Sequence, residues 1–194
     1  VRDFAQEIRE SFIRRNRSII YMQNLLLTVV NTVNLTEEKE NLIVQEEKEL
    51  MNRIYSYEHL TDIATDVIDI CCKISRLLNE QKDSYGKKQA VMALEYIEKN
   101  YMNSDINLNS VCSYLAMSTS YFSTLFKSYT GETFIEALTK KRMEKAKELL
   151  ENTSKKSYEV AGEVGFGDPH YFSIAFKKAT GKTPTEYAKE KRGA

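Results

Sequence analysis

The sequence predicts an all-α protein: a helical N-terminal bundle or linker, followed by a tandem helix-turn-helix domain whose two units are joined by a long connecting helix. Glycine and proline are scarce, with 7 and 2 copies in 194 residues, and tryptophan is absent. Leucine, glutamate, lysine and alanine, which favour helices, are common. Apolar residues recur three and four positions apart, which indicates helices with one buried face. A thirteen-residue pattern beginning at Tyr121 also appears a second time, beginning at Tyr171.

The repeated pattern reads Tyr-Phe-Ser-x-x-Phe-Lys-x-x-Thr-Gly-x-Thr, and its two copies start 50 positions apart. In each copy the two phenylalanines stand four positions apart, on one face of a helix. The glycine stands where that helix would end, and the threonine after it can cap the next helix. This period indicates a duplicated structural unit.

A short amphipathic helix and a turn precede the first copy. Residues 108–116 form the amphipathic run, and Met117 and Ser118 form the turn. Ser118 can then cap a helix over about residues 119–129. Two short helices joined by a tight turn, with the second exposing a reading face, form the motif that enters the major groove of DNA.

The second copy has the same surroundings. Residues 157–164 form the first helix, and Gly165 to Gly167 form the turn. Asp168 is then an N-cap with Pro169 at the first helical position, a favoured start. The helix that connects the two units, over residues 133–150, would be about 25 Å long for about 17 residues. Both units can therefore approach successive segments of the major groove.

These residues carry a family resemblance. Residues from about Tyr85 to Arg192, somewhat more than half of the chain, resemble the AraC-type DNA-binding domain. Besides the two copies, the matching segments are KRMEKAKELL at 141–150, VAxxVGF at 160–166 and GKTPTEY at 181–187. The likeness is greatest to bacterial regulators of the YesN type, in which this domain follows a receiver or a membrane-sensor segment.

The resemblance implies a sequence-specific transcription regulator that binds double-stranded DNA, with RNA polymerase as a candidate partner. The chain begins at Val1 without a methionine, so we expect it to be a piece of a longer signal-responsive regulator. No signal peptide or membrane-spanning run is visible, but in a piece of a longer chain this says little about the parent. A cytoplasmic location is expected because the cysteines are interpreted as buried apolar residues in a reducing compartment. A parent anchored in the membrane stays an alternative.

Two domains are expected, a helical linker or dimerisation region at 1–83 and the DNA-binding domain at 84–194. The first should hold three helices: residues 1–33, one starting after Thr36 and one starting after Ser56. Residues 79–88, polar and containing Gly86, are the best linker candidate, because they break the apolar pattern. A helix over residues 89–101 should then open the second domain.

The first helix has two interpretations, which are compatible with each other. It can be a bundle helix, or it can be a signalling or dimerisation helix inherited from an upstream domain, which would make a homodimer through residues 1–83. The charges are also unevenly distributed: residues 1–83 carry 11 basic and 15 acidic side chains, and residues 84–194 carry 17 and 13. A mildly basic second region is expected of a DNA-binding unit, although a mixed solvated surface fits the same numbers.

Base reading is assigned to exposed positions near the start of each repeated helix. The candidates are Ser120, Ser123 and Thr124 in the first copy and Pro169, His170 and Ile174 in the second. The chain departs from the family here, because many relatives have arginine at the places of Thr124 and Ile174. Arginine to guanine is the commonest specific contact, so we expect readout directed more to A·T pairs and to DNA shape. Ile174 has an alternative role as a partly buried core residue.

Phosphate contacts are assigned to basic residues in and around the two units. The candidates are Lys127, Lys141, Arg142, Lys155, Lys156, Lys177, Lys178 and Lys182. Lys127 and Lys177 rank first because both copies of the repeat hold them. The repeated phenylalanines are expected in the core rather than as base-stacking platforms. Ala116 stands where the second turn has Gly165, and an alanine forced to positive φ would cost roughly 1 kcal/mol.

An enzyme is not expected. The sequence has no phosphate-binding glycine loop, no nucleophile with a plausible base and no paired histidine and carboxylate. Its three cysteines, Cys71, Cys72 and Cys112, have no metal-site spacing, and nothing suggests a cofactor, a metal or a small-molecule ligand. The main rival hypothesis is a degenerate helix-turn-helix that acts as a helical protein-interaction module, which the absent arginines would favour.

Overall fold

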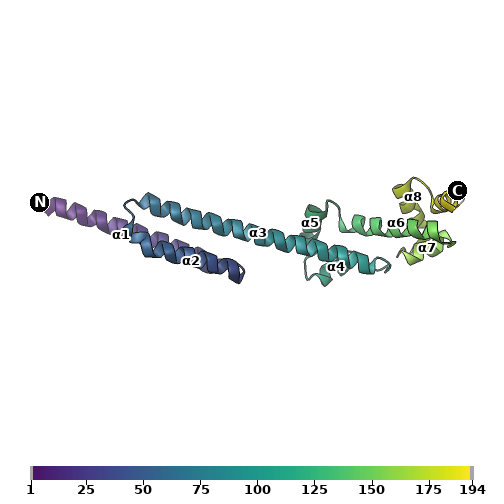
Figure 1. Cartoon of the computed structure of the whole chain (residues 1–194), viewed down its shortest axis with the longest axis horizontal. Coiled ribbons are helices and arrows are strands. Elements are labelled where there is room, and N and C mark those ends of the chain that lie inside the picture. The colour runs from purple at the N-terminus through teal and green to yellow at the C-terminus, as the bar shows by residue number, and fades with distance from the viewer. Residues whose placement is uncertain (1, 193–194) are drawn as a thin grey trace. The chain divides into compact units, whose positions relative to one another are not determined.

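A computed structural model describes residues 2–192, with side chains from residue 5 onward, and shows helices joined by short connections (Figure 1). The helices are α1 (Arg2–Thr32), α2 (Glu37–Arg53), the 3₁₀ helix η1 (Ile54–Ser56), α3 (Leu60–Asn100), α4 (Leu108–Tyr114), α5 (Thr119–Thr130), α6 (Phe134–Asn152), α7 (Ser157–Glu163), α8 (Pro169–Thr180) and α9 (Pro184–Arg192). The described residues contain no strand. The all-α prediction is therefore confirmed.

The chain divides into two compact regions, an N-terminal region (Val1–Ser84) and a C-terminal region (Tyr85–Ala194). The linker predicted at residues 79–88 is not a loop, because α3 is one continuous helix through them, although the boundary between Ser84 and Tyr85 does fall within this range. Their polar side chains suit the exposed face of a helix, and Gly86 has a packing role instead of ending the helix. A Cβ at Gly86 would lie 2.7 Å from the Tyr129 ring, so glycine lets the α5 side chain approach the α3 backbone closely.

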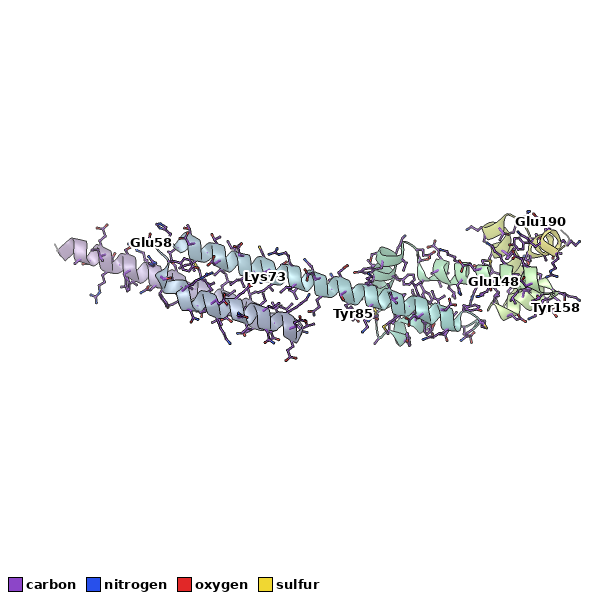
Figure 2. The ribbon with its side chains drawn as sticks, viewed as in Figure 1. Glu58, Lys73, Tyr85, Glu148, Tyr158 and Glu190 are labelled. Carbon is purple, nitrogen blue, oxygen red and sulfur yellow. The ribbon has the colours of Figure 1, made fainter. Side chains whose placement is uncertain are left out.

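The N-terminal region packs α1, α2 and the first part of α3 side by side (Figure 1). Its core includes Ile19 and Leu26 of α1, Ile43 and Leu50 of α2, and Ile63, Val67, Ile70 and Ile74 of α3, at helical spacing, together with Leu35 and Ile54. Lys73 of α3, which Figure 2 labels, forms an ion pair with Glu46 of α2 at the surface. The guanidinium of Arg15 donates to the carbonyl oxygen of Glu58 at 2.9 Å and to that of Tyr57, which joins α1 to the start of α3.

The C-terminal region contains two cores that share α6. Phe134, Ala137 and Leu138 of α6 belong to one core. That core also holds Phe122 and Phe126 of the first repeat copy. The C-terminal half of α6 enters the other core, with Phe172 and Phe176 of the second copy. All four phenylalanines are fully buried, as their spacing predicted.

The predicted caps are present in the C-terminal region. Ser118 caps α5, Thr133 caps α6 and Asp168 caps α8, each by a side-chain oxygen that accepts from a backbone N–H. Both repeated helices end at a glycine in the left-handed conformation, Gly131 and Gly181. These local signals are strong because each satisfies backbone groups that a helix end leaves without partners.

The two turns use the same backbone motif with different residues. Ala116 has φ 53° and Gly165 has φ 85°, so the alanine does adopt the positive φ that was considered as one alternative for the first turn. The next N–H in each turn reaches back to the preceding helix, from Met117 to the Cys112 carbonyl and from Phe166 to the Ala161 carbonyl, both at 2.9 Å. This is the Schellman arrangement. Alanine therefore occupies a position that favours glycine.

Candidate nucleic-acid interface

Helices α5 and α8 are the second helices of two helix-turn-helix units, and each presents one buried and one open face. Phe122, Leu125 and Phe126 bury one side of α5, while Phe172 and Phe176 bury the same side of α8. The opposite faces lie at the surface of the unit. This is the arrangement by which a recognition helix offers side chains to base edges.

The open face of α5 carries small hydroxyls. Ser120, Ser123 and Thr124 are all exposed. The Ser123 hydroxyl donates to the Thr119 carbonyl at 2.7 Å, and the Thr124 hydroxyl donates to the Ser120 carbonyl at 3.2 Å. Because these hydrogens are used within the helix, the two oxygens are left to accept hydrogen bonds, as from adenine N6 or cytosine N4.

The open face of α8 is different in chemistry. Pro169 and His170 are exposed at its first turn, and the Asp168 carboxylate accepts from the His170 N–H at 2.8 Å. Ile174 is 55% exposed, which argues against its alternative role in the core. It lines an open groove between α6 and α8 together with Tyr171, which is also exposed. An exposed isoleucine can contact a thymine methyl.

The candidate phosphate contacts fall into three groups. Lys127, Lys156, Lys177 and Lys178 are exposed side chains on or beside the two units. Lys141, Lys155 and Lys182 form ion pairs with Glu98, Glu163 and Glu190, so each would have to exchange a carboxylate for a phosphate. Arg142 alone is buried.

The assignment of Arg142 to a phosphate is wrong. Its side chain is enclosed, with the residue 9% exposed. Its Nε donates to the Tyr101 carbonyl and its Nη2 to the Asn103 carbonyl, both at 2.8 Å. The guanidinium also lies 5.3 Å from the centroid of the Phe166 ring. Burial lowers its pKa from the ordinary arginine value, a cost that these contacts offset. A sequence shows a basic residue but not which carbonyls surround it.

Lys127 and Lys177 have matched surroundings, which extends the repeat to electrostatics. Hydrogen bonds from Thr133 hold the pKa of the Glu136 carboxyl below its usual value, and the charge of Lys127 lowers it further. In the second copy Thr183 does the same for Glu186, with Lys177 nearby. Each lysine thus stands near the capping glutamate of the next helix.

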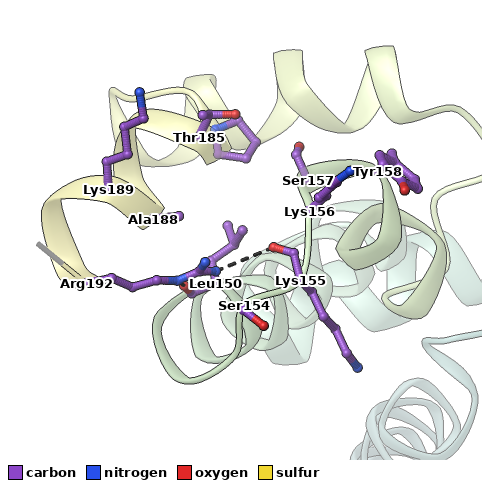
Figure 3. A pocket seen from close by; sticks show the side chains of 11 residues that line it. Leu150, Ser154, Lys155, Lys156, Ser157, Tyr158, Thr185, Ala188, Lys189 and Arg192 are labelled. Atoms are coloured by element: carbon purple, nitrogen blue, oxygen red, sulfur yellow. Dashed lines mark hydrogen bonds between the residues drawn. The ribbon is translucent and has the colours of Figure 1, made fainter.

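A basic groove near the C-terminus was not found from the sequence (Figure 3). It has a volume of about 680 Å³ and lies between the α6–α7 connection and α9. Lys155, Lys156, Lys189 and Arg192 line it. The Arg192 Nε donates to the Leu150 carbonyl at 2.7 Å, so this arginine is also partly committed to structure. Only the charge of residues 84–194 could have suggested this groove.

Other chemistry has little support in the described part of the chain. No group of three histidine, cysteine or carboxylate side chains there could hold a metal ion. The three cysteines are unbridged, and burial raises the pKa of the Cys112 thiol. No helix within residues 2–192 has both the length and the apolar character needed to cross a bilayer.

Comparison with known proteins decides the family. Residues 111–190 match a family model described as a helix-turn-helix domain. The raffinose operon transcriptional regulatory protein RafR of Pediococcus pentosaceus is 35% identical over 102 residues, which are 53% of this chain and 36% of that protein. The solved C-terminal domain of AraT, a response regulator from Geobacillus stearothermophilus, is 44% identical, covering 53% of this chain and 84% of that domain, with a TM-score of 0.52. The chain belongs to the AraC family.

A further relative places the likeness more narrowly. The uncharacterized transcriptional regulatory protein YesN of Bacillus subtilis is 44% identical over 82 residues, which are 41% of this chain and 22% of that protein. The chain thus spans well under half the length of both YesN and RafR. The AraC-type domain identifies a DNA-binding component of transcription regulators, which are not enzymes.

Proposed function

We propose that this chain is part of a sequence-specific transcription regulator whose α5 and α8 read two neighbouring segments of the DNA major groove. The observation that carries the proposal is the pair of recognition helices with open faces, each packed through its own core onto α6. The 19 residues of α6 make a helix about 28 Å long. Major-groove segments on one face of DNA repeat about every 34 Å, so modest bending would bring both helices into contact.

The proposed roles of the site residues follow their surroundings. Ser120, Ser123 and Thr124 of α5 would read bases through hydroxyl oxygens. Pro169, His170 and Ile174 of α8 would read them through an imidazole and apolar contacts. Because neither set contains arginine, base recognition should be weaker at G·C pairs. Phosphate binding would rest on the exposed lysines Lys127, Lys156, Lys177 and Lys178.

The test is selection of random duplex DNA by the full chain, followed by titration of the selected DNA at several salt concentrations. We expect an enriched site with two half-sites about one helical turn apart, and affinity that falls steeply as salt rises. Ser123→Ala should change preference in one half-site and His170→Ala in the other. Selection that returns no enriched sequence would count against specific reading by these helices.

The regions are proposed to divide the work, with residues 1–83 as a linker or dimerisation region and residues 84–194 as the DNA-binding domain. Ile8 and Phe12, 55% and 63% exposed, continue the core-facing stripe of α1 beyond Arg15. A homodimer through α1 would cover them, and Phe12→Glu should then abolish a dimer measured by sedimentation. A monomer at all concentrations in the unaltered chain would contradict this role.

The wider context is proposed from the relatives. The match to AraT and YesN supports a signal-responsive regulator, with a receiver or a sensor segment as its input, working in the cytoplasm on RNA polymerase. A rival function, a helix-turn-helix that binds a protein, is favoured by the apolar Tyr171 and Ile174 on the open face of α8. The salt titration separates the two functions. The logarithm of the affinity for DNA should fall steeply and linearly with the logarithm of the salt concentration, with a slope of about −0.9 per phosphate contact, whereas binding through these apolar side chains should depend little on salt.

A further inference from the structure

The two halves of helix α6 pack into two different cores. Phe134, Ala137 and Leu138 pack into the core of the first helix-turn-helix unit. One turn later, Met143 and Ala146 pack into the core of the second. Arg142 lies between the residues of the two cores, so a tilt of one helix-turn-helix unit against the other would alter its contacts.

The contacts of Arg142 reach both units. Its two hydrogen bonds go to Tyr101 and Asn103, in the segment that leads from α3 into the first unit. Its guanidinium faces Phe166, in the turn of the second unit. A planar group with several donors can bind two carbonyls and stack on a ring at once, which a lysine ammonium cannot do.

The backbones of the two units also meet at this point. A Cβ at Gly165 would lie 2.3 Å from the Tyr101 carbonyl oxygen and 2.9 Å from Nη2 of Arg142. Gly165 therefore lets the turn between α7 and α8 pack against the segment that leads from α3 to α4. With α6 as one connection and this contact as another, the two units are joined at two places.

We propose that Arg142 is a positioning residue, which holds α5 and α8 at a fixed mutual distance and so sets the spacing of the two half-sites that the domain accepts. This inference rests on the proposed DNA-reading function. It assigns to Arg142 neither a base nor a phosphate. Its effect on DNA recognition passes through the relative placement of the two recognition helices.

The first test measures that placement without DNA. In the full chain, Cys71→Ser, Cys72→Ser and Cys112→Ala remove the native thiols, and Thr124→Cys with Ile174→Cys places a spin label on each recognition helix. Double electron–electron resonance should give one narrow distance distribution. Arg142→Met should broaden it at least twofold. Lys145→Met is the matched control: it removes a cation from the same helix, and its ion pair with Glu148 stays within α6, so the distribution should stay narrow.

A milder variant guards against unfolding. Arg142→Lys keeps the charge and the apolar stem but loses the fork of donors, so it should also broaden the distribution. Circular dichroism selects the variants that keep their helix content. If the folded variants, Arg142→Lys among them, give a distribution as narrow as that of the parent, Arg142 does not position the helices.

The second test repeats the DNA selection with Arg142→Lys in the otherwise unaltered chain. We expect the same half-site sequences, while the affinity penalty for moving them one base pair apart or together falls by about tenfold, the size of one lost charge-assisted hydrogen bond. Unchanged spacing preference, with affinity lowered equally at every spacing, would assign Arg142 to stability alone. If the parent chain selects no DNA, the proposed function fails, and the spin-label distances still decide whether Arg142 positions the helices.

Discussion

The two helix-turn-helix units have the same backbone plan and different surfaces. Both have a seven-residue first helix, a Schellman turn and a twelve-residue recognition helix that ends at glycine. Their open faces differ, with serine and threonine hydroxyls on α5 and proline, histidine and isoleucine on α8. The buried pattern is kept because each core needs it, while the exposed positions are free to differ. Two unlike half-sites are therefore expected.

The turns also differ, and the difference has an energetic consequence. The first unit places Ala116 at positive φ, where a Cβ is strained, and the second places Gly165 there. Gly165 has a second reason to be glycine, because Tyr101 and Arg142 leave no room for a Cβ. Between the two turns, conformational strain is thus confined to the first unit, and close packing to the second.

The largest effect should come from removing a repeated phenylalanine. Phe122→Ala and Phe172→Ala each delete a fully buried ring, so each should lower the free energy of unfolding by about 3–5 kcal/mol. Urea unfolding followed by circular dichroism measures it. Equal losses would mean that the two cores contribute alike, whereas a second transition in only one variant would show that the cores unfold separately. A loss below about 1 kcal/mol in either variant would contradict the packing described.

Gly165→Ala should be the most damaging change in either turn. Strain at positive φ and the close approach of Tyr101 together predict a loss of about 2–4 kcal/mol. Gly131→Ala is the matched control, because Gly131 has φ 79° but no atom lies within 4 Å of the place that its Cβ would take, so strain acts alone. Equal losses in the two variants would show that the contact with Tyr101 adds nothing.

Lys127→Ala and Lys177→Ala test whether the units bind phosphates equally. Each should weaken binding to all DNA sequences alike and reduce the salt slope by about 1, as expected for one lost phosphate contact. Titration of selected and unrelated duplexes measures both quantities. Lys145→Ala, whose ammonium is held by Glu148, should leave the slope unchanged. If the two lysine variants bind as the parent does, the proposed docking is wrong.

Ala116→Gly should relieve the strained turn of the first unit. We expect a gain of about 0.5–1 kcal/mol, reduced by the greater freedom of glycine in the unfolded chain. Thermal unfolding of the variant beside the parent measures the change. A loss of stability would mean that the entropy of the unfolded chain outweighs the strain at φ 53°.

The smallest effect concerns pH. The Tyr187 hydroxyl donates to the Glu151 carboxylate at 2.5 Å, which raises the Tyr187 pKa to about 12. Because the folded pKa lies above the unfolded value, the contribution is complete below about pH 10 and is lost as pH rises toward 12. The parent should lose slightly more stability than Tyr187→Phe over that interval. Parallel curves for the two proteins would show that this bond adds no stability.

Local structure could be predicted well because its causes are local. The caps at Ser118 and Asp168 follow from side chains next to the backbone groups that they satisfy. The repeated phenylalanines are buried because residues four apart share a helix face. The family resemblance rested on the two repeat copies and on the motif segments at 141–150, 160–166 and 181–187, and the comparisons confirm it.

Predictions failed where a residue's role depends on a distant partner. Gly86 was predicted to lie in a linker, but it lies inside α3 against the Tyr129 ring. Arg142 has the charge expected of a phosphate contact, but its guanidinium donates hydrogen bonds to two backbone carbonyls some forty positions earlier. Lys141 stays a candidate phosphate contact, and only the structure shows that Glu98 competes for its ammonium.

The sequence by itself therefore determined most of the helices, the ends of the two repeated helices and the duplication, because propensity, periodicity and capping act over a few residues. Its motifs also carried the family resemblance. The tertiary structure decided which cations stay exposed and which, like Arg142, are enclosed by backbone carbonyls. It also decided how the two units meet at Gly165. These outcomes depend on which segments become neighbours in space, and the packing of α6 into two cores sets that.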